Sequence, residues 1–146
     1  MQLLIEKAAV LIEALPYIQK FRGDTIVVKF GGSIMDNPGG VRSILQDVTF
    51  MAVVGLRPVI VHGGGKAISQ KMKAAGLTPE FRLGLRVTDE ATIGIVEQTL
   101  NQEINPQMVR TLREFDCKAR GIHGEDILHV RPKTGRDPNT GETVSW

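Results

Sequence analysis

The fold is decided by two glycine-rich stretches, Lys29-Phe30-Gly31-Gly32-Ser33 and His62-Gly63-Gly64-Gly65-Lys66. Each stretch follows an apolar run rich in β-branched residues, 25–28 before the first and 58–61 before the second. Such runs predict short buried strands that end where the glycines begin. The chain therefore repeats one unit, a strand followed by a glycine turn.

The segments after the two turns change to a helical pattern. Residues 39–54 and 66–75 carry apolar side chains three and four positions apart, which predicts helices that each bury one face. A connection from strand through helix to strand is almost always right-handed, so the two strands should be parallel, with both turns at one edge of the sheet. The pattern predicts an α/β fold built on a parallel sheet.

Glycine turns at the carboxyl ends of parallel strands favour anion binding. Backbone N–H groups at a helix start have no partner inside the helix, and glycines without Cβ atoms let an anion approach them. Lys29 ends the first strand and adds a positive charge of fixed direction. The alternative is that the glycines serve only the backbone of two tight turns. Because two similar turns occur, we favour a phosphate-handling site with Lys29 at its centre.

The composition is that of one soluble globular domain. The chain has 146 residues, a formal net charge of +2 and no basic block, which argues against a nucleic-acid partner. No apolar run approaches the ~20 residues of a membrane span and no signal-peptide layout begins the chain, so we expect a cytoplasmic protein without a membrane partner. Cys117 is the single cysteine, and His123 and His129 lack companions at metal-ligand spacing. We therefore assign no metal site.

The first 21 residues predict an amphipathic helix. Its apolar stripe lies opposite charged residues and comprises Leu3, Leu4, Ala8, Leu11, Ile12, Leu15 and Ile18. Pro16 lacks an N–H and clashes with the preceding turn, so we expect a kink or break near Ala14 and Leu15. The stripe can be covered by the helix's own domain or by another subunit, and the residues alone favour neither.

Residues 77–86 have a mixed, partly alternating character, which predicts a short hairpin or an extended excursion. Arg86 ends this stretch, shortly before Thr88, which is expected to cap a helix. An arginine placed here after Gly84 can present its planar fork to a carboxylate, with charge-assisted bonds of roughly 1.5–3 kcal/mol each. The alternative is an exposed surface arginine, and the spacing alone favours that alternative.

The helix after Thr88 is expected to reach Asn105 and then either to kink or to end at Pro106, before a second piece to Phe115. Its inward positions should be Ile93, Val96, Leu100 and Ile104. Strands are expected at 117–122, 127–130 and 143–146, and a polar loop at 133–142.

Three motifs resemble those of the amino acid kinase family: Val27-Val28-Lys29-Phe30-Gly31-Gly32-Ser33, Val61-His62-Gly63-Gly64-Gly65-Lys66 and Gly84-Leu85-Arg86-Val87-Thr88-Asp89. The first is shared across that family. The second and third together are specific to its branch that phosphorylates N-acetyl-L-glutamate. The resemblance runs from about Leu11 to Asp126. It implies a parallel-sheet αβα sandwich of the amino acid kinase type, in its N-terminal lobe, with an extra N-terminal helix.

The resemblance also implies an activity. ATP, with Mg²⁺, would give its γ-phosphoryl group to the γ-carboxylate of N-acetyl-L-glutamate, a step of arginine biosynthesis. Lys29 would be catalytic and would neutralise charge on the transferring phosphoryl group. The phosphate-binding residues would be Lys29, Gly31, Gly32 and Gly63. These roles agree with the pattern of the turns, because phosphoryl transfer depends on positioning and charge stabilisation.

The same resemblance assigns substrate contacts and a regulatory residue. The substrate-binding residues would be Gly63, Gly64 and Arg86, with Arg86 on the α-carboxylate of N-acetyl-L-glutamate. The N-terminal helix resembles an extension that joins dimers in hexameric, arginine-inhibited members of the family. This implies a homo-oligomer, a dimer or hexamer, joined through that helix. Tyr17 would then lie near the inhibitor.

The resemblance implies a division of the chain at residue 22. Residues 1–22 would form the oligomerisation and regulatory helix, and 23–146 the lobe that binds the amino-acid substrate. The family's second lobe, which binds the nucleotide, is not among these 146 residues, so we expect negligible turnover by this chain alone. The alternative is a non-catalytic module that binds an acylated amino acid or joins an assembly through its N-terminal helix.

Overall fold

The computed structural model describes all residues except Leu83, Val130, Pro132, Lys133, 137–140, Glu142 and Trp146. The helices are α1 (Gln2–Phe21), η1 (Gly32–Asp36), α2 (Pro38–Val53), α3 (Gly65–Ala74), α4 (Glu90–Glu97), η2 (Gln98–Ile104), α5 (Asn105–Glu114) and η3 (Gly124–Asp126). The strands are β1 (Thr25–Phe30), β2 (Arg57–His62), β3 (Phe81–Arg82), β4 (Leu85–Arg86), β5 (Thr134–Arg136) and β6 (Thr143–Ser145). Two compact units contain them, residues 1–63 with 110–119 and residues 64–109 with 120–146.

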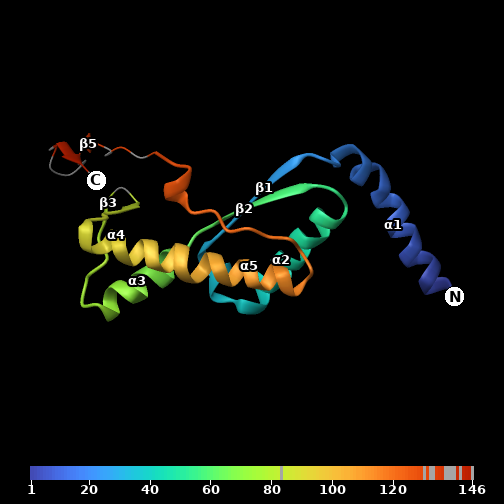
Figure 1. Ribbon diagram of the computed structural model, residues 1–146, viewed down its shortest axis with the longest axis horizontal. Helices are drawn as coiled ribbons and strands as arrows, with labels where there is room; N and C mark the ends of the chain where they lie inside the picture. Colours follow the sequence, from blue (N-terminus) through green and yellow to red (C-terminus); the bar gives the residue numbers. More distant parts are fainter. Residues whose placement is uncertain (83, 130, 132–133, 137–140, 142, 146) are drawn as a thin grey trace. The chain divides into compact units, whose positions relative to one another are not determined.

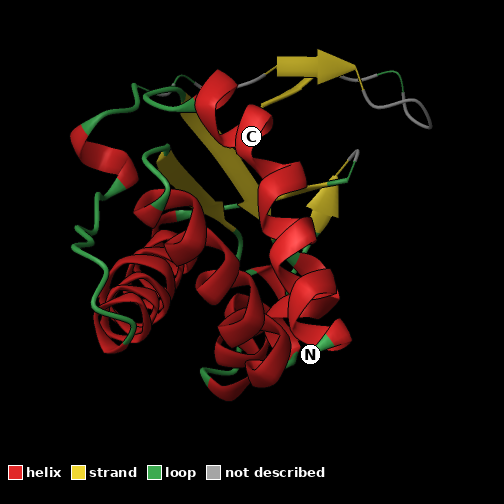
Figure 2. Ribbon diagram, turned by 90° about the vertical axis from the view of Figure 1, so that its right-hand side faces the viewer, coloured by secondary structure: helices red, strands yellow, loops and turns green. Residues whose placement is uncertain are grey.

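The first unit is built on a parallel pair of strands. β1 and β2 lie side by side and run in the same direction (Figures 1 and 2), with Thr25 opposite Arg57 at one end and Phe30 opposite His62 at the other. α2 connects them and packs on β2. Asn37 begins this helix by accepting a 3.1 Å hydrogen bond from the Gly40 N–H, and Gly55 follows it with a φ of +98°. The predicted α/β fold with a parallel sheet is confirmed.

The strands of this pair are buried on one face only. Val27, Val59 and Val61 are 63, 44 and 47% exposed, whereas Phe30 is only 7% exposed. Successive side chains of a strand point to opposite faces, so this alternation follows the pleat. The prediction of fully buried strands is therefore wrong for one face. The apolar runs of β1 and β2 do not alternate with polar residues, so their sequence does not show that one face of the sheet is exposed.

The core of the first unit lies on the other face of the sheet. Its buried apolar side chains are Phe30, Leu45, Val48 and Leu112. Leu45 is fully buried, and Thr49 one turn later uses its hydroxyl to bond the Leu45 carbonyl at 2.9 Å. Arg42 of α2 joins Glu114 at 2.5 Å and stacks on the Phe115 ring. The segment from 110 to 119 therefore closes this unit against α2.

α1 is a continuous helix whose apolar stripe is uncovered. It runs across Pro16 without interruption, so of the predicted kink or break the break is wrong, and the kink stays a prediction. Proline removes only one backbone hydrogen bond from this 20-residue helix. None of its residues is buried, and Leu4, Leu11 and Ile12 are each more than 60% exposed. Among the described residues, no helix is both long enough and apolar enough to cross a membrane.

The second unit contains α3, the β3–β4 hairpin and the α4–η2 helix. The hairpin pairs Phe81 with Arg86, which confirms the predicted hairpin. The buried apolar side chains of the second unit are Ile68, Met72 and Met108. The helix after the hairpin is capped by Asp89, which accepts a 2.8 Å bond from the Thr92 N–H. The prediction that Thr88 is the cap is wrong, because the Asp89 carboxylate reaches an orphan N–H of the first turn instead.

The middle of the long helix departs from α-helical spacing. Residues 98–104 form the π-helix η2. Because α4, η2 and α5 follow one another without a gap, the helix does not end at Pro106. A π-helix bonds residue i to i+5. Ahead of it, α4 turns Thr92 rather than Ile93 to its buried side. Thr92 and Thr99 are 3 and 0% exposed, whereas Ile93, predicted to point inward, is 51% exposed.

The predictions for the last 30 residues are mostly wrong. Residues 117–122 form no strand, and backbone groups at both ends of this segment bond the preceding helix instead. The Cys117 N–H donates to the Leu112 carbonyl at 3.0 Å, and the Ile122 carbonyl accepts from the Asn105 side-chain amide at 3.1 Å. Residues 127–129 form no strand either, and Val130 lies outside the described residues. β6 confirms the strand predicted at 143–146 apart from undescribed Trp146, and its partner β5 occupies the predicted loop.

Candidate functional site

Gly31 of the first glycine turn lies against Gly63, the last residue of the first unit before the chain enters the second. A Cβ placed on Gly31 would lie 3.6 Å from the Gly63 nitrogen, and the Gly63 N–H donates to the Phe30 carbonyl at 3.1 Å. Gly32 begins η1 with a φ of +61°, a backbone conformation that residues with a side chain rarely adopt. The predicted meeting of Gly31 with Gly63 at one edge of the sheet is confirmed. Because the Gly63 N–H is engaged by Phe30, its role as a phosphate donor stays a prediction.

Lys29 is the cationic residue of this turn. It lies one position before the end of β1, opposite Val61, on the strand face that also exposes Val27. Its ammonium makes no hydrogen bond or ion pair with another described residue. β1 sets the face of the sheet from which this side chain extends, whereas its flexible four-carbon stem lets the ammonium follow an anion on that face.

The second glycine turn is tightly packed in the second unit. Gly64 is buried, and a Cβ on it would meet Leu100 Cδ2 at 2.7 Å and Ile104 Cδ1 at 2.8 Å. A side chain on Gly64 would therefore have to displace the ends of these two η2 side chains. Gly64 is also the N-cap of α3, with no side-chain cap, so the first N–H groups of that helix lack a side-chain acceptor.

Arg86 is held by three neutral acceptors of α3. Its Nη2 donates to the Gly65 carbonyl at 2.9 Å and to the Ser69 hydroxyl at 2.7 Å. Its Nη1 donates to the Met72 sulfur at 3.0 Å. These three residues, Gly65, Ser69 and Met72, recur every three or four positions and so share one face of the helix. The exposed surface arginine, which spacing alone favoured, is thus not what the structure shows.

The Arg86 guanidinium is also stacked, and its charge is not neutralised. Its central carbon lies 4.7 Å from the centre of the Phe81 ring, across the β3–β4 pair. No acidic side chain among the described residues pairs with it. Arg82, in the same hairpin, instead bonds Glu80 at 2.9 Å. A partly buried arginine without an acid is a ready partner for an anionic ligand.

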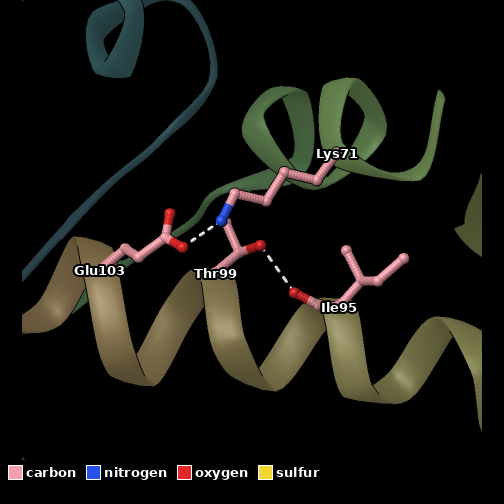
Figure 3. Close-up of polar contacts among 4 residues, drawn as sticks. All are labelled: Lys71, Ile95, Thr99 and Glu103. Atoms are coloured by element: carbon pink, nitrogen blue, oxygen red, sulfur yellow. Dashed lines mark hydrogen bonds and ion pairs between the residues drawn. The ribbon is translucent and has the colours of Figure 1, made fainter. Parts of the chain in front are cut away.

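An ion pair joins α3 to η2. Figure 3 shows the Lys71 ammonium reaching the Glu103 carboxylate, with Thr99 beside them. Thr99 is fully buried and donates its hydroxyl to the Ile95 carbonyl at 2.6 Å. The buried hydroxyl is therefore satisfied within its own helix.

The remaining polar candidates have separate surroundings. His62 places Nδ1 3.3 Å from the Gly63 carbonyl, which orders the turn. His123 lies 3.6 Å from Glu125, which also accepts a 2.7 Å bond from Asn101. Tyr17 lies on α1 and is 65% exposed. In the described part of the chain, no three histidine, cysteine or carboxylate side chains gather closely enough to hold a metal ion.

Sequence reasoning found Arg86 but missed what holds it. Ser69 and Met72 share a helix face with Gly65, and that spacing was readable. Nothing in the sequence linked this face to Arg86 or to Phe81, because the hairpin that joins them is set by tertiary structure. Of the predicted residues, Gly31, Gly32, Gly63 and Lys29 lie in the first unit, and Gly64 and Arg86 in the second.

Comparisons with known proteins agree with these motifs. Residues 24–144 match the model of the "Amino acid kinase family". The acetylglutamate kinase of Akkermansia muciniphila is 45% identical over 144 residues, which is 95% of this chain and 48% of that protein. The acetylglutamate kinase of Thermoanaerobacter sp. (strain X514) is 48% identical over 138 residues, 94% of this chain and 46% of that protein. The chain thus spans about half the length of these relatives.

A solved structure is also similar. N-acetylglutamate synthase from Neisseria gonorrhoeae, complexed with coenzyme A and N-acetyl-glutamate, superposes with a TM-score of 0.62 at 30% identity. The match covers 73% of this chain and 24% of that one. The family match over residues 24–144 agrees with the parallel β1–β2 pair and the two glycine turns. This chain belongs to the amino acid kinase family.

Proposed function

We propose that these residues belong to an acetylglutamate kinase, which phosphorylates the γ-carboxylate of N-acetyl-L-glutamate with ATP in arginine biosynthesis. The observation that carries the proposal is Arg86, whose guanidinium is held by neutral acceptors and lacks an acidic partner among the described residues. The curated relatives, at 45 and 48% identity, support it. A cytoplasmic location accompanies this biosynthetic role.

Arg86 binds the α-carboxylate of N-acetyl-L-glutamate in this proposal. A guanidinium forms charge-assisted hydrogen bonds with a carboxylate, worth roughly 1.5–3 kcal/mol each. Gly64 and Gly63 let the substrate approach the backbone of the second turn, because neither carries a Cβ. Gly64 is buried against η2, which fixes the place of this turn.

Lys29 and the first turn act on the phosphoryl group. Phosphoryl transfer needs charge neutralisation and alignment more than covalent chemistry, and the Lys29 ammonium, which no other described residue binds, supplies charge. Backbone N–H groups of Gly31 and Gly32 complete the phosphate contacts, while Gly63, whose N–H bonds the Phe30 carbonyl, leaves room for the phosphate because it carries no Cβ. ATP brings Mg²⁺ bound to its phosphates, and we assign no Mg²⁺ ligand to the described residues, since they contain no acidic cluster that fits one.

The test is a calorimetric titration of the chain with N-acetyl-L-glutamate, beside L-glutamate. We expect saturable binding of the acetylated ligand and at least tenfold weaker binding of the free amino acid. Equal affinities, or no binding of the acetylated ligand, would contradict the proposed substrate. An exposed-site control is Arg82→Ala, which removes a neighbouring arginine already paired with Glu80 and should leave the affinity unchanged.

The second candidate, an assembly module, is favoured by the uncovered stripe of α1. Leu4, Leu11 and Leu15 are 69, 67 and 44% exposed, and a soluble protein covers so long an apolar stripe. We propose that α1 joins copies of this chain into a dimer or hexamer, and that Tyr17 on the same helix has a regulatory role. Sedimentation should show an oligomer that Leu4→Gln with Leu11→Gln dissociates. A wild-type monomer at all concentrations would contradict this proposal.

A further inference from the structure

Ser69 lies at the centre of the contacts that fix Arg86. Its hydroxyl donates to the Gly65 carbonyl one turn earlier on α3, at 2.9 Å. The same oxygen accepts the Arg86 Nη2 proton at 2.7 Å, and Nη2 also donates to the Gly65 carbonyl. Because the hydroxyl proton is committed to Gly65, the oxygen lone pairs face Arg86. Ser69 is half-buried, and its bond with Arg86 is partly shielded from solvent.

The donors of Arg86 divide into those that are used and those that are left. A guanidinium has five N–H groups. Among the described residues two on Nη2 bond Gly65 and Ser69, and one on Nη1 bonds Met72. The Nε proton and one Nη1 proton have no acceptor among the described residues. The whole positive charge is left as well, since every partner is neutral.

We propose that Ser69 is a positioning residue for Arg86 in binding the α-carboxylate of an acylated amino acid. This inference rests on the function proposed above. Binding normally costs an arginine much of its rotamer freedom, and Ser69, with the Phe81 ring, removes most of that freedom beforehand. A neutral anchor does this without cancelling the charge that the ligand needs, whereas an acidic residue at the same place would cancel it.

The proposal distinguishes three substitutions at this position. Ser69→Ala removes one of the three acceptors of Arg86 and leaves Gly65 and Met72, so it should weaken N-acetyl-L-glutamate binding about threefold to tenfold. Ser69→Thr keeps the hydroxyl and should bind within about twofold of wild type. Ser69→Asp neutralises Arg86 and should weaken binding more than Ser69→Ala does. Ser43→Ala, at an exposed serine of α2, is the matched control and should have no effect.

A ligand without the α-carboxylate separates positioning from general damage. N-acetyl-L-glutamate α-amide lacks the group that Arg86 binds, so wild type and Ser69→Ala should bind it equally. In an Arg86→Ala background, Ser69→Ala should add no further loss. If Ser69→Ala binds N-acetyl-L-glutamate as well as wild type does, or more tightly, the proposal is overturned. Thermal melting shows that each variant is folded, which is expected because alanine favours helices.

A measurement without ligand keeps this inference separable from the proposed substrate. Nitrogen-15 spectra of the arginine side chains, with Arg86 assigned from the Arg86→Lys spectrum, report rotation of its Nη groups. We expect hindered rotation in wild type and Ser69→Thr, and faster rotation in Ser69→Ala. Failure of wild type to bind N-acetyl-L-glutamate contradicts the proposed substrate, whereas rotation unchanged in Ser69→Ala contradicts the positioning role.

Discussion

The two glycine turns have similar sequences and opposite surroundings. The first, at Gly31 and Gly32, has room: a Cβ on Gly31 makes only ordinary contact, and one on Gly32 meets nothing within 4 Å. The second, at Gly64, has none, since Leu100 and Ile104 occupy the space where a Cβ would lie. Glycine therefore has a different role in each turn: at Gly32 it allows a positive φ, and at Gly64 it allows close packing.

The two basic residues near these turns differ in the same way. Lys29 lies beside the first turn, and no other described residue binds its ammonium. Arg86, in contrast, is fixed by Gly65, Ser69 and Met72. A fixed cation suits a substrate group that does not change during reaction. A mobile cation suits a phosphoryl group whose charge moves in the transition state. The contrast suggests recognition by Arg86 and charge stabilisation by Lys29.

The largest expected effect on stability comes from the packed turn. Gly64→Ala places a methyl group 2.7 Å from Leu100 and 2.8 Å from Ile104, so we expect the free energy of unfolding to fall by about 1–3 kcal/mol. Gly31→Ala is the matched control: its backbone is extended and its nearest contact is 3.6 Å, so its cost should be well below 1 kcal/mol. Denaturant unfolding measures both. Equal losses would remove the contrast between the turns.

A smaller effect is expected from the ion pair behind the Arg86 anchor. Lys71 and Glu103 are 34 and 44% exposed, so solvent screens their attraction. A double-mutant cycle with Lys71→Met and Glu103→Gln should give a coupling free energy of about 0.2–1 kcal/mol. Lys73→Met, on the same helix, should show no coupling to Glu103→Gln. A coupling near zero for Lys71 would mean that this pair does not support α3.

The smallest effect is a pH dependence at the helix that follows Arg86. Hydrogen bonds from Thr92 lower the pKa of Asp89 from its ordinary value of 3.8. A lowered pKa stabilises the fold above the unfolded value, and this stabilisation is lost as pH falls through the folded value. Asp89→Asn should therefore lessen the loss of stability in acid below about pH 4. Thr88→Ala should leave the acid dependence as in wild type, and a change there would favour Thr88 as the cap.

The sequence was sufficient for the parallel pair because its signals are local. Apolar runs before Gly31 and Gly63 predicted β1 and β2, and chirality predicted that they are parallel. The strand predicted at 117–122 failed, and backbone groups at both ends of this segment bond residues of the preceding helix instead. Ile93 failed because α4 buries the neighbouring Thr92 instead, and a polar side chain on the buried face is not signalled by the spacing of apolar residues.

The candidate site was predictable in its residues and not in its contacts. Lys29, the glycines and Arg86 carry motifs, and a motif can be read without a structure. Ser69 and Phe81 carry none, and they became visible only when the β3–β4 hairpin brought Arg86 to α3. The exposed face of β1 and β2 could not be predicted either, since runs of apolar residues read as buried on both sides.

The measurement that tests the division of roles most directly is a titration of wild type, Arg86→Ala and Lys29→Ala with N-acetyl-L-glutamate alone. Arg86→Ala should weaken binding about tenfold to a hundredfold, since it removes charge-assisted bonds to the α-carboxylate. Lys29→Ala should bind within about threefold of wild type, because no phosphoryl group is present for it to stabilise. Wild-type affinity in Arg86→Ala, or equal losses in both variants, would contradict the account.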